Sequence, residues 1–165
     1  MGDHGARQLT PILPRRLVKR NRQGGFQLNL NADDRVALRQ LAEQFEALLD
    51  DPDQEVLHRL FPPAYSQAEH TSQEEEYRRL MRDDLVERHR DELNLVAATA
   101  EEQNLSEEQL LAWTRAINSV RLVLGTYLDV SEDDERNPPA TPEEALYHWL
   151  SYLLGEAIDA LAGQT

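Results

Sequence analysis

The sequence predicts a mainly α-helical protein: a helical bundle of four longer helices and one short helix, with an N-terminal β-hairpin packed on it. Residues 113–130 are apolar over most of a helix circumference, apart from a narrow polar strip that includes Arg115 and Ser119. A helix with apolar residues on two sides packs against neighbours on two sides, so it is expected at the bundle centre. Three further stretches repeat apolar residues at helical spacing, and 165 residues suffice for one domain with a single core.

The first part of the chain combines a basic arm with a hairpin pattern. Residues 1–14 show little periodicity and are expected to form a flexible basic arm, ahead of a single helical domain with an N-terminal hairpin over residues 15–163. Apolar and polar residues alternate over residues 26–30, and two glycines before them supply a turn. We therefore expect a β-hairpin within residues 17–30, with its apolar face on the helices, because a lone hairpin is only marginally stable.

Polar caps and prolines locate the starts of the helices. An N-cap side chain accepts a hydrogen bond from a free backbone N–H of the first turn, and proline is pre-organised for the first helical position. Helices are expected over residues 32–49, 52–60, 74–103, 107–130 and 142–162. The residues that mark their starts are Asn31, Pro52, Thr71 or Ser72, Ser106 and Thr141.

Charge is distributed unevenly along the chain. The net charge is −14, yet residues 1–22 carry six basic residues against one aspartate, a net +5 that leaves −19 for the rest. An acidic body repels the phosphate backbone of DNA. Five of the six basic residues are candidate contacts with nucleic acid, with an acidic partner, or with the chain's own acidic body, which is the simplest interpretation. These five are Arg15, Arg16, Lys19, Arg20 and Arg22.

Several classes of protein are disfavoured by what the sequence lacks. With no cysteine, the chain has no disulfide, no thiolate metal site and no thiol switch. No window approaches the ~18 apolar residues of a membrane span, and the first residues lack the pattern of a secretory signal. We expect a cytoplasmic protein that does not contact a membrane.

His89 and Glu92 form the one pair that resembles half of a metal site or an acid–base couple. They stand three residues apart on an apolar arc of their helix, but the facing segments supply leucines rather than further ligands, and His58 is the only candidate second ligand. We therefore expect a polar pair at the edge of the core, with no catalytic, cofactor-binding or metal-binding residues and no cofactor. A metal-dependent enzyme that uses this pair is the alternative.

Two residues of the central helix are unusual for a packing helix. Arg121 lies at the edge of the apolar face and needs a carboxylate partner, for which Asp84 is the best candidate, so we predict a structural ion pair between them. Gly125 lies mid-helix, where it costs about 0.5–1 kcal/mol relative to alanine, and close packing of a neighbour is the expected compensation. Near the C-terminus, three aromatic residues suit either the core or a partner-binding surface: Tyr147, Trp149 and Tyr152.

The order of four motifs resembles a known family. They are LFPPAY (60–65), EYRRLMRDDL (76–85), WTRAINSVRLVLGTYL (113–128) and LYHWLSYLLGEAIDAL (146–161). Together they resemble the actinobacterial oxidative-stress transcriptional regulators, the AosR-like proteins, formerly a domain of unknown function, and the resemblance covers about residues 15–162. It implies a regulator that contacts a sigma factor or RNA polymerase in a stress response. The cysteine pair proposed for redox sensing in such regulators is missing here.

The leading expectation is thus a non-enzymatic transcriptional regulator or adaptor that acts through protein–protein contacts. The first alternative is a nucleic-acid-contacting regulator that uses the basic arm, and direct DNA binding is left open. Homodimerisation through the apolar last helix is compatible with each of these functions.

Overall fold

The computed structural model describes residues 15–61, 72–130 and 137–163, and the predicted arm over residues 1–14 lies outside them. Four helices and a small sheet make up the described fold. The helices are α1 (Ala32–Leu48), α2 (Ser72–Thr99), α3 (Glu107–Tyr127) and α4 (Pro142–Leu161), with a short 3₁₀ helix η1 (Glu55–Leu57). The strands are β1 (Val18–Arg20), β2 (Phe26–Leu28) and β3 (Asn104–Leu105). None of the described helices combines the length and the apolar character needed to cross a bilayer.

The predicted caps fix the starts of three helices. The Asn31 side chain accepts a hydrogen bond from the Asp34 backbone N–H at 2.8 Å, and Ser106 does the same for α3 at 3.1 Å. Thr141 caps α4, whose first residue is Pro142. In α2 the first residue is Ser72. The mainly α-helical bundle with an N-terminal hairpin is therefore confirmed.

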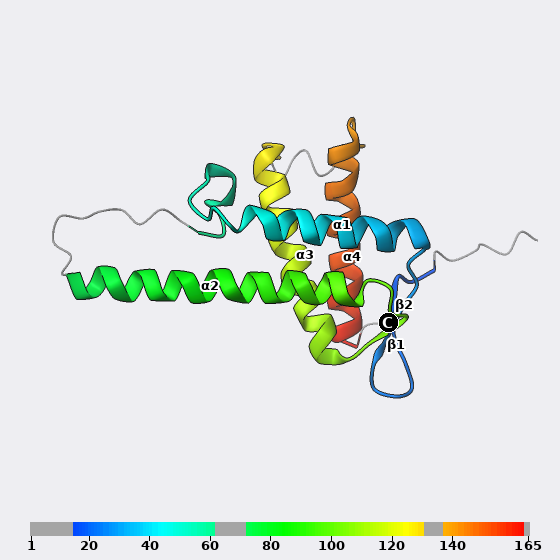
Figure 1. The fold of residues 1–165 in the computed structure, drawn as a ribbon. Coiled ribbons are helices and arrows are strands. Elements are labelled where there is room, and N and C mark those ends of the chain that lie inside the picture. The colour runs from blue at the N-terminus through cyan, green and yellow to red at the C-terminus, as the bar shows by residue number, and fades with distance from the viewer. Residues whose placement is uncertain (1–14, 62–71, 131–136, 164–165) are drawn as a thin grey trace, which may run out of the picture.

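The four helices form two pairs that cross each other (Figure 1). Helices α1 and α2 run alongside each other in opposite directions, and they lie across α3 and α4, which pack side by side. The first half of α2 extends past the other helices. The bundle proper thus engages only part of the longest helix.

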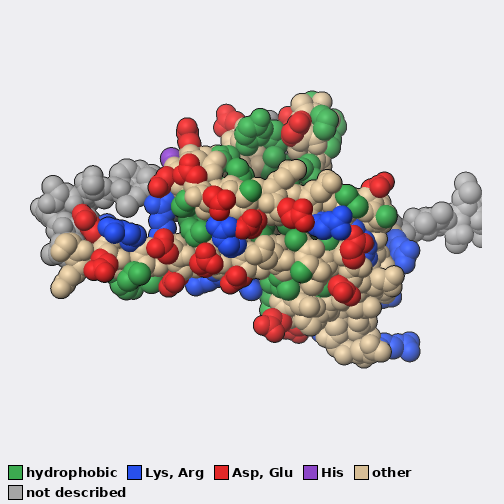
Figure 2. All heavy atoms as spheres, in the orientation of Figure 1, with side chains coloured by type: hydrophobic (Ala, Val, Ile, Leu, Met, Phe, Trp, Pro, Cys, Tyr) green, Lys and Arg blue, Asp and Glu red, His purple; other side chains and the backbone are tan. Residues whose placement is uncertain are grey.

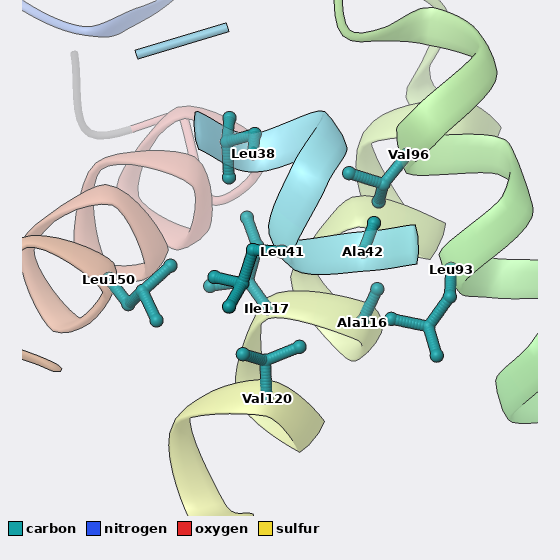
Figure 3. Close-up of a pocket in the computed structure, with 9 residues that line it drawn as sticks. All are labelled: Leu38, Leu41, Ala42, Leu93, Val96, Ala116, Ile117, Val120 and Leu150. Carbon is teal, nitrogen blue, oxygen red and sulfur yellow. The ribbon is translucent and has the colours of Figure 1, made fainter. Parts of the chain in front are cut away.

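The hydrophobic core lies where the two pairs cross (Figure 3). Ala42 of α1 and Ala116 of α3 bring short side chains to the crossing, which lets these helices approach closely. The void left among the lining side chains is about 10 Å³, no more than one water occupies, and its walls are apolar. The centre of the bundle is therefore closed packing and offers no ligand site. The lining residues come from all four helices: Leu38, Leu41, Ala42, Leu93, Val96, Ala116, Ile117, Val120 and Leu150.

The predicted hairpin is the first part of a three-stranded antiparallel sheet with the order β1-β2-β3. In the register, Val18 faces Leu28, and Phe26 faces Leu105 of the third strand. Gly24 supplies the turn with a φ of +85°. The predicted end of α2 at residue 103 was wrong, because the helix ends at Thr99 and the following residues lead into β3, which pairs with β2. The predicted short helix over residues 52–60 is likewise reduced to the single 3₁₀ turn of η1.

A buried arginine joins the sheet to the helices. Arg35 of α1 is 8% exposed and donates hydrogen bonds to four backbone carbonyls: Leu28 at 3.2 Å, Leu30 at 3.3 Å, Ala100 at 2.9 Å and Glu102 at 2.6 Å. Because guanidinium is a planar group with five donors, one side chain can satisfy carbonyls from two segments at once. Arg35 therefore links β2 to the segment that joins α2 to β3.

Candidate functional site

His89 and Glu92 of α2 belong to a polar cluster between α2 and α3. Glu92 is 7% exposed and accepts a hydrogen bond from Arg115 Nε at 2.6 Å. His89 Nδ1 lies 3.2 Å from Ser119 Oγ and 3.9 Å from the second oxygen of Glu92. The Phe61 ring packs edge-on against the imidazole, with 5.6 Å between the ring centres. The pair therefore lies at the edge of the core, and α3 supplies its partners.

The hydrogen bonds of this cluster do not activate the Ser119 hydroxyl as a nucleophile. Ser119 is buried, and its hydroxyl donates to the Arg115 carbonyl oxygen at 3.0 Å. His89 Nδ1 then acts as the donor to Ser119 Oγ. In a serine–histidine–acid relay the serine and the acid contact opposite nitrogens of the ring, whereas here both lie against Nδ1. This geometry suits a structural network, in which the charge of Glu92 is balanced by Arg115.

Burial sets the protonation of His89. Desolvation lowers the pKa of the imidazole, Glu92 opposes this by raising it, and Arg88 lowers it further. Among the described residues, no group of three or more histidines and carboxylates is placed to hold a metal ion. The candidate second ligand, His58, has its Nε2 3.2 Å from the Asp53 carbonyl oxygen.

The basic residues before and within β1 contact the chain's own last helix. Arg16 forms ion pairs with Glu156 at 3.5 Å and Asp159 at 3.7 Å, and the Leu17 backbone N–H donates to Glu156 at 3.1 Å. Arg20 donates to the Leu161 carbonyl oxygen at 3.4 Å. Part of the positive charge is thus used within the fold, where it holds the sheet against α4.

Four of the five basic candidates, all except Arg16, have no acidic partner within the described part of the chain. Arg15 donates to the Asn29 side chain at 3.2 Å, while Lys19 and Arg22 are exposed. The Arg20 guanidinium lies 4.9 Å from the centre of the Phe26 ring. What remains for an external contact is therefore a small group of cations along the hairpin, with Arg15 at its open end and Lys19 and Arg22 nearer its turn.

The predicted ion pair between Arg121 and Asp84 is absent from the ion pairs of the described residues, and this prediction needs correction. Arg121 faces α4 instead: it donates to the Tyr147 hydroxyl at 3.3 Å and its guanidinium lies 5.8 Å from the centre of that ring. A second hydrogen bond of 3.5 Å goes to Asn118 on its own helix. Asp84 is exposed on α2. The two helices present these side chains in different directions, which a wheel of either helix alone does not reveal.

Gly125 lies against the same tyrosine. A Cβ at this position would be 3.0 Å from Tyr147 Cε2, closer than ordinary packing allows. The glycine therefore leaves the room that lets α4 approach α3, which is the kind of close packing expected for it. Of the three C-terminal aromatics, Tyr147 is buried, Trp149 is partly buried against the core, and Tyr152 is 49% exposed.

The first half of α2 carries an exposed apolar face that was not predicted from the sequence. Tyr77, Leu80 and Met81 are 65%, 59% and 51% exposed. Acidic and basic side chains are interspersed along the same helix in the space-filling view (Figure 2). The available signal was the low amphipathicity of α2, whose first half has charged residues in excess of apolar ones. Such a face on a projecting helix is a candidate contact surface.

Two surface hollows flank the helices. One, of about 500 Å³, lies between Phe61 and α2 and includes three arginines, Arg78, Arg82 and Arg88. The other, of about 450 Å³, lies between α1 and α3 and is almost entirely apolar, with Phe45 and Val123 in its wall and Tyr127 at one side. The hollow beside Phe61 combines charged and apolar side chains, whereas the hollow between α1 and α3 is lined like the adjoining hydrophobic core.

Comparison with known proteins identifies a family without a described activity. The profile of the family described as a domain of unknown function (DUF2017) matches residues 15–161. No curated protein and no solved structure matches the chain.

Proposed function

The chain belongs to the DUF2017 family, and from that premise we propose that it is a non-enzymatic regulator or adaptor that acts through protein–protein contacts in transcription. The observation that carries the proposal is the exposed apolar face of α2 formed by Tyr77, Leu80 and Met81. Contiguous apolar surface on a projecting helix is unfavourable in water, and a partner that covers it removes this cost. The face therefore supports contact with another protein.

The partner class follows from the resemblance to the AosR-like regulators. That resemblance points to a sigma factor or RNA polymerase, in a stress response and in the cytoplasm. The net charge of −14 supports a protein partner over a phosphate backbone, because the acidic body repels DNA at long range. The missing cysteines mean that any stress signal reaches this protein by a route other than its own thiols.

The two alternatives have less support. A nucleic-acid contact through the basic segment would have to rely on Arg15, Lys19 and Arg22, because Arg16 is paired with α4 and Arg20 donates to the Leu161 carbonyl oxygen. Binding to DNA that weakens steeply with salt and is lost in a Lys19→Ala/Arg22→Ala variant would favour it. An enzyme that uses His89 and Glu92 would need a substrate to enter a cluster that is already hydrogen-bonded internally.

The proposal is tested by purifying tagged protein from its native host and identifying the bound proteins by mass spectrometry. The test variant replaces the exposed face, Tyr77→Ser/Leu80→Ser/Met81→Ser. The matched control, Tyr152→Ser/Ile158→Ser, removes apolar side chains of similar exposure from α4. Circular dichroism before the experiment establishes that both variants fold.

We expect wild type and the α4 control to recover RNA polymerase subunits or a sigma factor, and the α2 variant to lose them. Equal recovery by the α2 variant would show that this face is not the contact. Recovery of only a protease complex or ribosomal proteins by the wild type would refute the transcription function itself.

A further inference from the structure

We propose that the hollow between Phe61 and α2 binds an acidic segment of the partner protein that also carries apolar side chains. This inference rests on the proposed function, because it specifies the chemistry of the segment that the partner contributes. The hollow measures about 500 Å³, within the range of ~300–1,000 Å³ that is usual for binding pockets. It adjoins the exposed face of α2, since Met81 belongs to both.

The apolar part of the hollow is formed by three side chains. Phe61 is 2% exposed and gives a fixed wall, Leu85 is partly buried, and Met81 is 51% exposed. Methionine adapts its shape to different apolar partners because its side chain is unbranched and flexible. This surface can therefore cover one or two apolar side chains of a docked segment.

The charged part of the hollow is mostly positive. Three arginines line it, Arg78, Arg82 and Arg88, against one carboxylate, Asp84. Arg82 is held by Asp53 at 2.6 Å, whereas neither Arg78 nor Arg88 is in an ion pair among the residues that the structure describes. On a chain with a net charge of −14, two guanidinium groups that have no ion pair with any described residue, beside an apolar surface, are a local exception. Their charge complements carboxylates, which guanidinium binds through paired hydrogen bonds.

The spacing of Arg78 and Arg88 specifies the segment further. Arg78 and Arg88 are ten positions apart on one helix, which corresponds to roughly 15 Å along its axis. An extended peptide covers that length in about four to five residues. The segment we infer therefore has acidic residues at the two ends of a short apolar stretch.

Selection from a library of random peptides displayed on phage tests this inference with purified full-length protein. Three proteins are compared: wild type, Arg78→Gln/Arg88→Gln, and the control Arg59→Gln/Arg79→Gln. The control removes the same charge from exposed arginines that do not line the hollow. Circular dichroism verifies that the three proteins have the same helical content.

We expect wild type and control to enrich peptides with Asp or Glu flanking apolar residues, and the hollow variant to lose this enrichment. A synthetic peptide of the enriched sequence should bind the hollow variant about tenfold more weakly than the control, and should bind wild type more weakly as salt is raised. Equal binding to all three proteins, or enrichment without acidic residues, would overturn the inference. It would leave the proposed function intact if the native purification still recovers the transcription proteins.

Discussion

The two halves of α2 have the same secondary structure and opposite environments. From Val86 to Thr99 the helix buries apolar side chains such as Leu93 and Val96, together with the Glu92 carboxylate. From Ser72 to Leu85 no side chain of the helix is buried. The second half is explained by the core that it fills, whereas the apolar residues Tyr77, Leu80 and Met81 of the first half remain exposed in the described part of the chain. The second half of α2 thus contributes to the stability of the fold, whereas the first half offers a surface for contact with another protein.

The largest effect on stability is expected in the second half. Leu93 is 2% exposed and lines the central core, so Leu93→Ala should lower the free energy of unfolding by about 2–5 kcal/mol, through lost burial and the cavity left behind. Urea denaturation followed by circular dichroism measures it. A loss below about 1 kcal/mol would mean that this half of α2 is as dispensable to folding as the first.

Arg35 of α1, which binds backbone carbonyls just after the end of α2, allows a similar stability test on a buried polar side chain. Arg35→Leu removes the donor for four backbone carbonyls that are hydrogen-bonded in the wild type, and we expect a loss of about 2–4 kcal/mol. Arg35→Lys keeps the charge with fewer and differently placed donors, so its loss should be smaller but still measurable. Urea denaturation of both variants gives the values. If the two variants were as stable as wild type, the sheet would be held to the bundle without this side chain.

Much of the fold could be predicted from the sequence, because helix caps and apolar periodicity are local signals. Asn31, Ser106 and Thr141 were each identified from their spacing to the first turn. The third strand was missed because two residues carry no periodicity, and they pair with β2 only once α2 has ended. Arg35 was missed for a related reason. It lies three residues before Leu38 on the buried stripe, but two of its four carbonyl partners, Ala100 and Glu102, come from the distant segment after α2.

The candidate site was predictable only in part. The pairing of His89 with Glu92 follows from their spacing on one helix, yet their partners on α3 depend on how the two helices cross. The same reason defeated the predicted partner of Arg121, which contacts Tyr147 of α4. A helical wheel shows which residues share a face of a helix, but it does not show which neighbouring helix that face packs against.

The polar cluster in the second half of α2 predicts a pH dependence of stability. Burial lowers the pKa of His89 in the folded protein below the ordinary 6.5, so the unfolded chain binds the proton more readily. The stability that comes from the neutral imidazole is complete above about pH 6.5 and falls as the pH drops below that value.

His89→Gln should therefore lose less stability than wild type between pH 8 and pH 5, measured by urea denaturation at each pH. The difference between the unfolding free energies of the two proteins at each pH isolates the contribution of His89 from that of the carboxylates, which are common to both proteins. The control His148→Gln makes the same substitution at an imidazole on α4, outside the polar cluster. Parallel curves for wild type and His89→Gln would show that burial of this imidazole does not affect folding.

The smallest effect on stability is expected where the sequence is most exposed. Leu80→Ala removes the same atoms from α2 as Leu93→Ala, but the Leu80 side chain is 59% exposed and the change should stay within about 0.5 kcal/mol. Alanine also favours the helix slightly, which offsets any lost contact. A loss approaching that of Leu93→Ala would place Leu80 in a packed environment and remove the basis for a contact face. A stable variant that no longer recovers transcription proteins would instead show that one helix carries two separable tasks.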